Sequence, residues 1–160
     1  MKSPKVFPHL WYAKEAEEAA RFYASIFPDS RVDAVTSLMT DTPSGPAGSV
    51  KVVDFTLFGQ RFQAISAGPH HEFNDAISLV VLCDDQAELD RYWNALLEGG
   101  GKPMACGWLT DRFGLRWQIV PAVMETMMAD PDPARARKAT DAMMQMVKFD
   151  IAALEKAYRS

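Results

Sequence analysis

The alternation of apolar and polar residues along the first half of the chain predicts four strands and one helix. Apolar residues recur at helical spacing in the segment KEAEEAARFYASIF, and Pro28 ends it. A loop rich in Pro, Gly and Ser interrupts the strand-like runs, and Gly59-Gln60 is typical of a tight hairpin turn. The expected elements are strands at 5–12, 31–39, 51–58 and 61–66 and a helix at 14–27.

The second half repeats this order of elements. The run AISLVVLC is almost continuously apolar, which predicts a strand with both faces buried. A helix should follow it, with Asp84 or Asp85 as N-cap and the glycines from Gly99 as its end. The segments KPMACGWLTD and LRWQIVP are the remaining strand regions, joined by a turn at 112–114.

A short phrase occurs twice, as FGQRFQ at 58–63 and as FGLRWQ at 113–118. The helices also match, because Arg-Phe-Tyr at 21–23 corresponds to Arg-Tyr-Trp at 91–93. We interpret the chain as a duplicated βαβββ unit of the α+β class, in which two curved mixed sheets enclose a cavity. The predicted organisation is 1–121 for the paired modules, at about 5–67 and 76–121, and 122–160 for a C-terminal helical extension.

The extension carries an apolar helical face with several methionines. Ala139, Met143, Met146 and Val147 lie on that face, and Asp150 is the expected N-cap of a last helix. Methionine fills irregular apolar gaps because its side chain is flexible. Two interpretations follow: the extension packs on its own domain, or it clasps a second subunit.

Composition restricts the partners and the compartment. The net charge of −4, without a basic stripe, argues against nucleic acid. No apolar run is long enough for a membrane span, and the segment MKSPKVFPHLWY lacks the features of a secretory signal. Cys83 and Cys106 are isolated, which indicates two buried thiols in a reducing cytoplasm in preference to a disulfide or a metal pair. We therefore expect a cytoplasmic protein.

Four segments resemble the vicinal oxygen chelate superfamily, which includes glyoxalase I, bleomycin-resistance proteins and extradiol dioxygenases. They are HLWYAKEAEEAARFYASIFPDS, FNDAISLVVLCDD, YWNALLEGGG and GWLTDRFGLRWQIVP. Within that superfamily they resemble the PhnB-like family, often labelled 3-demethylubiquinone-9 3-methyltransferase. The resemblance covers most of residues 6–121, and it implies that the metal-ligand positions of metal-dependent members correspond to His9, Gln63, Ser78 and Gln118.

Together, these four residues form a poor ligand set for a transition metal. Zinc, iron and nickel sites use imidazole, thiolate and carboxylate groups, whereas two positions here are amides and one is a hydroxyl. An amide offers two donors and two acceptor lone pairs without charge, so Gln63 and Gln118 suit a polar organic ligand. We predict no cofactor; a divalent metal held by an altered ligand set is the alternative.

Several neighbouring residues extend this candidate site. Strand alternation places Arg61 beside Gln63 and Arg116 beside Gln118, where they would favour an anionic or carbonyl-rich ligand unless they only cap hairpin ends in solvent. Asp54 lies on an otherwise apolar strand and is either a structural acid or a cavity-facing base. The remaining candidates are Trp11 and Trp108 as aromatic walls or core, His9 as a base, and the adjacent histidines at 70–71, expected to face solvent.

We therefore expect a homodimeric protein that binds a small polar or anionic organic molecule. The alternative is an enzyme of the superfamily, either a metal-dependent lyase, isomerase or dioxygenase with altered ligands, or the methyltransferase of the family label. The glycines at 99–101 follow a helix and not a strand, so they predict a helix end and not a cofactor loop. A structural dimer with a filled cavity is the third possibility.

Overall fold

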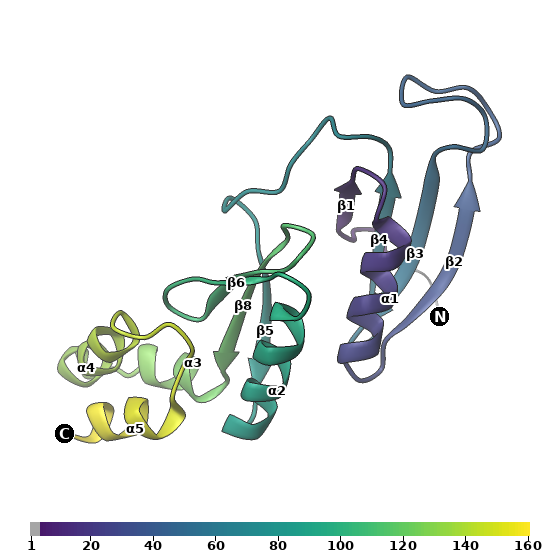
Figure 1. The fold of residues 1–160 in the computed structure, drawn as a ribbon. Coiled ribbons are helices and arrows are strands. Elements are labelled where there is room, and N and C mark those ends of the chain that lie inside the picture. Colours follow the sequence, from purple (N-terminus) through teal and green to yellow (C-terminus); the bar gives the residue numbers. More distant parts are fainter. Residues whose placement is uncertain (1–3) are drawn as a thin grey trace. The chain divides into compact units, whose positions relative to one another are not determined.

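The computed structural model describes residues 4–160, which form two compact units. Residues 1–3, where the predicted domain and the N-terminal segment begin, lie outside the described residues. The first unit ends at Phe73 and the second runs from Asn74 to Ser160. Each unit contains a four-stranded mixed sheet and a helix that follows its first strand (Figure 1). Within residues 4–160 no helix is long and apolar enough to cross a membrane.

The first unit has the predicted order of strand, helix and three strands. Its sheet order is β1-β4-β3-β2, in which β1 pairs with β4 in parallel and the other pairs are antiparallel. The elements are β1 (His9–Tyr12), α1 (Ala16–Ile26), β2 (Arg31–Ser37), β3 (Lys51–Leu57) and β4 (Gln60–Ser66).

The second unit repeats this topology and adds the C-terminal helices. Its sheet order is β5-β8-β7-β6, with β5 parallel to β8. The elements are β5 (Leu79–Cys83), α2 (Gln86–Leu97), β6 (Lys102–Pro103), β7 (Trp108–Thr110), β8 (Arg116–Pro121), α3 (Val123–Met128), α4 (Pro133–Met143) and α5 (Ile151–Arg159). The predicted duplicated βαβββ modules with C-terminal helices are therefore confirmed.

Two local predictions from the sequence are wrong. The hairpin turn between β3 and β4 consists of Phe58 and Gly59, with φ of 48° and 75°, because a two-residue turn of this type needs positive φ at both positions. Gln60 already pairs with Leu57 in the ladder. The run 76–83 was expected to be buried on both faces, yet Val80 and Leu82 are 54% and 44% exposed.

The loop that joins β7 to β8 is organised by a buried carboxylate. Asp111 accepts hydrogen bonds from the backbone N–H groups of Phe113 and Leu115 at 2.8 and 3.1 Å and from Trp117 Nε1 at 2.9 Å. These bonds satisfy an acid that is only 3% exposed. The repeated Phe-Gly lies in this loop between Thr110 and Arg116 in the second unit, which is longer than the turn between Leu57 and Gln60 in the first.

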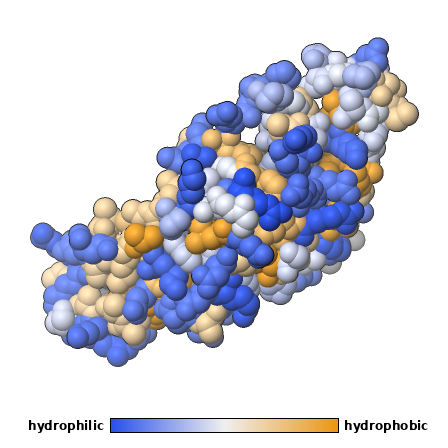
Figure 2. All heavy atoms as spheres, viewed as in Figure 1, coloured by the Kyte–Doolittle hydropathy of each residue, from blue (hydrophilic) through white to orange (hydrophobic). Residues whose placement is uncertain are grey.

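The C-terminal extension packs on the second unit, which supports the first of the two interpretations above. Phe149 and Leu154 are fully buried, and the backbone N–H groups of Cys106 and Gly107 donate to the carbonyls of Met146 and Val147 at 2.8 Å. Asp150 caps α5 as expected, by accepting from Ala153 N–H at 3.0 Å. Figure 2 shows hydrophilic and moderately hydrophobic side chains intermixed over this region.

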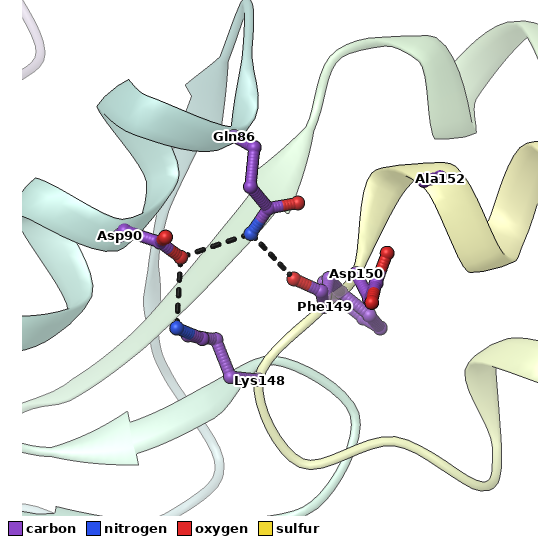
Figure 3. Close-up of a pocket in the computed structure, with 6 residues that line it drawn as sticks. All are labelled: Gln86, Asp90, Lys148, Phe149, Asp150 and Ala152. Atoms are coloured by element: carbon purple, nitrogen blue, oxygen red, sulfur yellow. Dashed lines mark hydrogen bonds and ion pairs between the residues drawn. The ribbon is translucent and has the colours of Figure 1, made fainter.

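Gln86, in the first turn of α2, links that helix to the extension (Figure 3). Its Nε2 donates to the Phe149 carbonyl at 3.0 Å and to Asp90 Oδ1 at 2.9 Å. Its Oε1 accepts from Ile151 N–H at 2.9 Å, and Lys148 Nζ lies 2.8 Å from Asp90 Oδ1. The hydrogen bonds from Lys148 and then from Gln86 lower the pKa of Asp90, because both stabilise its ionised form.

We expect Asp90→Asn to destabilise the protein slightly at neutral pH and not at low pH. A lowered folded-state pKa contributes stability that is complete above the ordinary value of 3.8 and is lost as the pH falls through the folded-state value. Because the pair with Lys148 is part-exposed, the melting temperature should fall by about 1–3 °C at pH 7. Thermal melts at a series of pH values check this. Asp141→Asn, in a more exposed pair, is the control; an equal loss there would contradict a special role for Asp90.

Gly107→Ala should cost much more stability than Gly48→Ala. Both glycines have positive φ, of 77° and 83°, which costs an alanine about 1–2 kcal/mol. Only at Gly107 would the new Cβ meet a buried neighbour, at 2.2 Å from Phe149 Cε2, which adds about 1–3 kcal/mol of overpacking. Urea unfolding of the two variants measures the difference. Equal losses would contradict the close packing of Phe149 on this glycine.

Candidate functional site

The alternation of β4 separates its residues onto a buried and a half-exposed side of the first sheet. Phe62 and Ala64 are buried, whereas Arg61 and Gln63 are half-buried. We call the side of the sheet that carries Arg61 and Gln63 the open face. The same alternation in β8 places Arg116 and Gln118 on the open face of the second sheet, with Trp117 and Ile119 buried.

Strand pairing brings three polar residues into one row across the first sheet. His9 of β1 lies opposite Gln63 of β4 in the parallel ladder. On the other side, Asp54 of β3 lies opposite the same Gln63 in the antiparallel ladder. Residues that pair directly in a sheet point to the same face, so all three side chains meet on the open face.

Hydrogen bonds connect this row. Gln63 Nε2 donates to Asp54 Oδ1 at 3.2 Å, and Gln63 Oε1 lies 2.9 Å from His9 Nδ1. Arg61 Nη2 donates to the same Asp54 oxygen at 2.7 Å, and its guanidinium lies 4.0 Å from the centre of the Phe7 ring. Arg61 therefore pairs with an acid on this face, and Asp54 points towards the site as a hydrogen-bonded carboxylate.

Trp11 lies on the same strand as His9 and contacts the loop that follows β4. Its Nε1 donates to the Gly68 carbonyl at 2.9 Å. The rings of His70 and His71 meet it edge-on, with centroids at 6.4 and 4.9 Å. Both histidines are exposed as expected, yet they also hold the loop against Trp11.

The corresponding row of the second sheet has a different chemistry. Gln118 lies between Val80 of β5 and Trp108 of β7 in the ladder. Ser78 precedes β5, so Val80 and not Ser78 is the register counterpart of His9. Gln118 Nε2 nevertheless donates to Ser78 Oγ at 2.9 Å. This row is thus mainly apolar and aromatic around one amide.

Both arginines of the candidate site have a carboxylate partner. Arg116 Nε donates to Asp75 Oδ1 at 2.7 Å, and its Nη1 donates to the Gly114 carbonyl at 2.7 Å. Arg61 has Asp54 at the same distance. An anionic ligand would have to compete with these acids, so the arginines favour anions less than the sequence suggested.

The residues present do not fit a transition-metal site. Within residues 4–160 no group of three His, Cys, Asp or Glu side chains could hold a metal ion. The expected positions supply one imidazole, two amides and a hydroxyl. Both cysteines are free; burial raises the pKa of the Cys83 thiol to about 12, which keeps it protonated. The chain's own donors therefore do not match the usual ligand sets of zinc, iron or nickel.

A pocket of about 440 Å³ lies between α2 and the start of α5, and none of the predicted site residues lines it (Figure 3). Its polar atoms are used in attaching the extension, since Gln86, Asp90 and Lys148 bond to one another or to the backbone at Phe149 and Ile151. The spacing of Gln86 and Asp90 predicts their mutual bond on a helix, but no pattern in the sequence predicts contact with a segment about 60 residues away.

Comparison with solved structures places this fold among known proteins. One similar structure is a PhnB protein from Bacillus cereus that carries the same 3-demethylubiquinone-9 3-methyltransferase label. Its sequence is 29% identical and its structure has a TM-score of 0.65; the match covers 74% of this chain and 100% of that one. Protein PA1353 from Pseudomonas aeruginosa is 23% identical with a TM-score of 0.53, over 72% and 95% of the two chains. The fosfomycin resistance protein FosX from Mesorhizobium loti shares the fold at 14% identity and a TM-score of 0.52, over 79% and 98%.

No curated protein matches the chain. The model of one protein family, 3-demethylubiquinone-9 3-methyltransferase, matches residues 4–120, which include the whole first sheet with its polar row and all of the second sheet except the last residue of β8. The chain therefore belongs to the 3-demethylubiquinone-9 3-methyltransferase, or PhnB-like, family.

Proposed function

We propose that this protein binds a small polar or anionic organic molecule against the open faces of its sheets, without a typical transition-metal site. The observation that carries the proposal is the row of His9, Gln63 and Asp54, which presents an imidazole, an amide and a carboxylate on one half-exposed face. Such groups give orientation through hydrogen bonds, each worth about 0.5–1.5 kcal/mol when neutral. Trp11 supplies apolar surface beside this row, and Trp108 does so separately beside Gln118 on the second sheet.

A polar uncharged group suits this face better than a strong anion. Arg61 is paired with Asp54 and Arg116 with Asp75, so each guanidinium charge is offset by a carboxylate. Carbonyl and hydroxyl groups can bond to the remaining donors and acceptors without displacing either acid. We therefore favour a carbonyl- or hydroxyl-rich molecule within the proposed class.

The chain's residues support binding rather than the methyl transfer in the family name. Gly99 and Gly100 have positive φ and end α2, so they form a helix end and not the strand-to-helix turn that holds a nucleotide-like cofactor. An enzyme of the superfamily with an altered ligand set is the competing function, and metal content distinguishes the two.

Freshly purified, untagged protein should contain less than stoichiometric transition metal and should retain a small organic molecule. Elemental analysis and native mass spectrometry on the same sample measure both. Gln63→Ala and Gln118→Ala should each reduce the retained molecule by about tenfold, as expected for a lost hydrogen bond of about 1.4 kcal/mol. Gln60→Ala, on the same strand as Gln63 but outside the row, is the matched control and should not change it. A stoichiometric metal that Gln118→Ala removes would overturn the proposal in favour of the metal-dependent enzyme.

We further propose that the protein acts in the cytoplasm as a homodimer that covers apolar residues of the second open face. Val80 and Leu82 of β5 are exposed there. Leu82→Glu should therefore convert a dimer into a monomer of 17.8 kDa, because a buried unpaired charge opposes association.

Light scattering after gel filtration measures the mass of each variant. Val147→Glu is the control, since Val147 is exposed to a similar degree but lies on the extension, and this variant should stay dimeric. A wild-type protein of monomer mass, or equal dissociation of both variants, would contradict the proposed interface.

A further inference from the structure

On the first open face, the charge of Asp54 determines which atoms donate and which accept along the row of hydrogen bonds. Asp54 pairs with Arg61 at 2.7 Å, and its side chain is only 26% exposed. An ionised carboxylate has no proton to donate, so any group that hydrogen-bonds to Asp54 must be a donor. Whatever faces Asp54 from the neighbouring strand must therefore present an N–H or O–H.

Gln63 is that neighbour, and the requirement fixes its orientation. The amide turns its Nε2 towards Asp54, at 3.2 Å, because the opposite orientation would place two acceptor oxygens against each other. The carbonyl Oε1 then points away from Asp54, towards β1. The charge of Asp54 thus determines the orientation of the uncharged Gln63 amide.

The orientation of the Gln63 amide determines which nitrogen of His9 carries the proton. Nδ1 lies 2.9 Å from Gln63 Oε1, and an oxygen without a proton can only accept, so Nδ1 must carry the proton. In the neutral imidazole the other nitrogen, Nε2, then holds a lone pair. His9 is exposed, and among the described residues of the first unit, 4–73, no group hydrogen-bonds to its Nε2.

We propose that Asp54 and Gln63 are positioning residues that hold His9 with its proton on Nδ1, so that Nε2 accepts a hydrogen bond from a hydroxyl, enol or N–H group of the ligand. This inference rests on the proposed function and narrows it, since it assigns the protic end of the ligand to the first sheet. The second sheet has Val80 at the corresponding place in its row, with no acceptor of this kind.

The tautomer of His9 can be read directly by long-range proton–nitrogen correlation NMR on protein labelled with nitrogen-15 at histidine. At about pH 9, where an ordinary imidazole is neutral, wild-type His9 should show a protonated Nδ1 and a bare Nε2. His70 and His71 are internal references in the same spectrum. A wild-type His9 protonated on Nε2 would overturn the inference.

Two single variants and their combination test the chain of hydrogen bonds. Asp54→Asn allows the Gln63 amide either orientation, and Gln63→Ala removes it, so both should shift the His9 population towards the Nε2–H form by at least about fivefold. The double variant D54N/Q63E should restore the Nδ1–H form, because a glutamate at this place can only accept from His9 and from the new asparagine amide. A merely structural loss would not be rescued in this way. Unchanged tautomers in both single variants would contradict the positioning role.

The acceptor role of Nε2 is tested with a pair of probes that differ in one proton. Phenol can donate its O–H to Nε2, whereas anisole has the same ring with a methyl ether and cannot. Phenol should shift the His9 Nε2 resonance in wild-type protein and at least about fivefold less in Gln63→Ala, and anisole should leave it unchanged. Equal effects of the two probes, or none, would reject the acceptor role. The tautomer result needs no ligand, so failure of the proposed function, seen as no retained molecule, is distinguishable from failure of this inference.

Discussion

Backbone pairing of the central strand in each sheet decides where every side chain of the candidate site lies. β4 pairs in parallel with β1 and antiparallel with β3, and this double register brings His9 and Asp54 to either side of Gln63. A slip of one residue in either ladder would move one of these side chains to the buried face. The polar row therefore depends on ladder hydrogen bonds that carry no information about side-chain chemistry, while the buried face holds the register through its apolar residues.

Duplication has preserved the scaffold more strictly than the site. The same ladder geometry surrounds Gln118, but its neighbours are Val80 and Trp108 in place of an imidazole and a carboxylate. The two sheets thus offer a polar and an apolar surface built from one topology.

The C-terminal extension is attached to the second unit by three kinds of contact: apolar packing, amide hydrogen bonds and an ion pair. Phe149 provides apolar burial over Gly107, where a side chain would not fit. Gln86 satisfies one backbone donor and one backbone acceptor of the same segment, which would otherwise lie near the apolar contact without partners. The pair of Lys148 and Asp90 at the edge is more exposed and adds a contribution that depends on pH.

The sequence by itself determined the duplicated order of strands and helix, because periodicity and the repeated Phe-Gly-x-Arg phrase depend on local spacing. It also determined the N-cap Asp150 and restricted the N-cap of α2 to Asp84 or Asp85, of which the structure selects Asp85. Both capping bonds reach only three residues along the chain. Only the tertiary structure decided that Asp54 contacts Gln63, that Val80 is the register counterpart of His9, and that Gln86 holds Phe149. These contacts join residues that are distant in sequence, and their geometry depends on ladder register and loop length, for which the local pattern of residues has no signal.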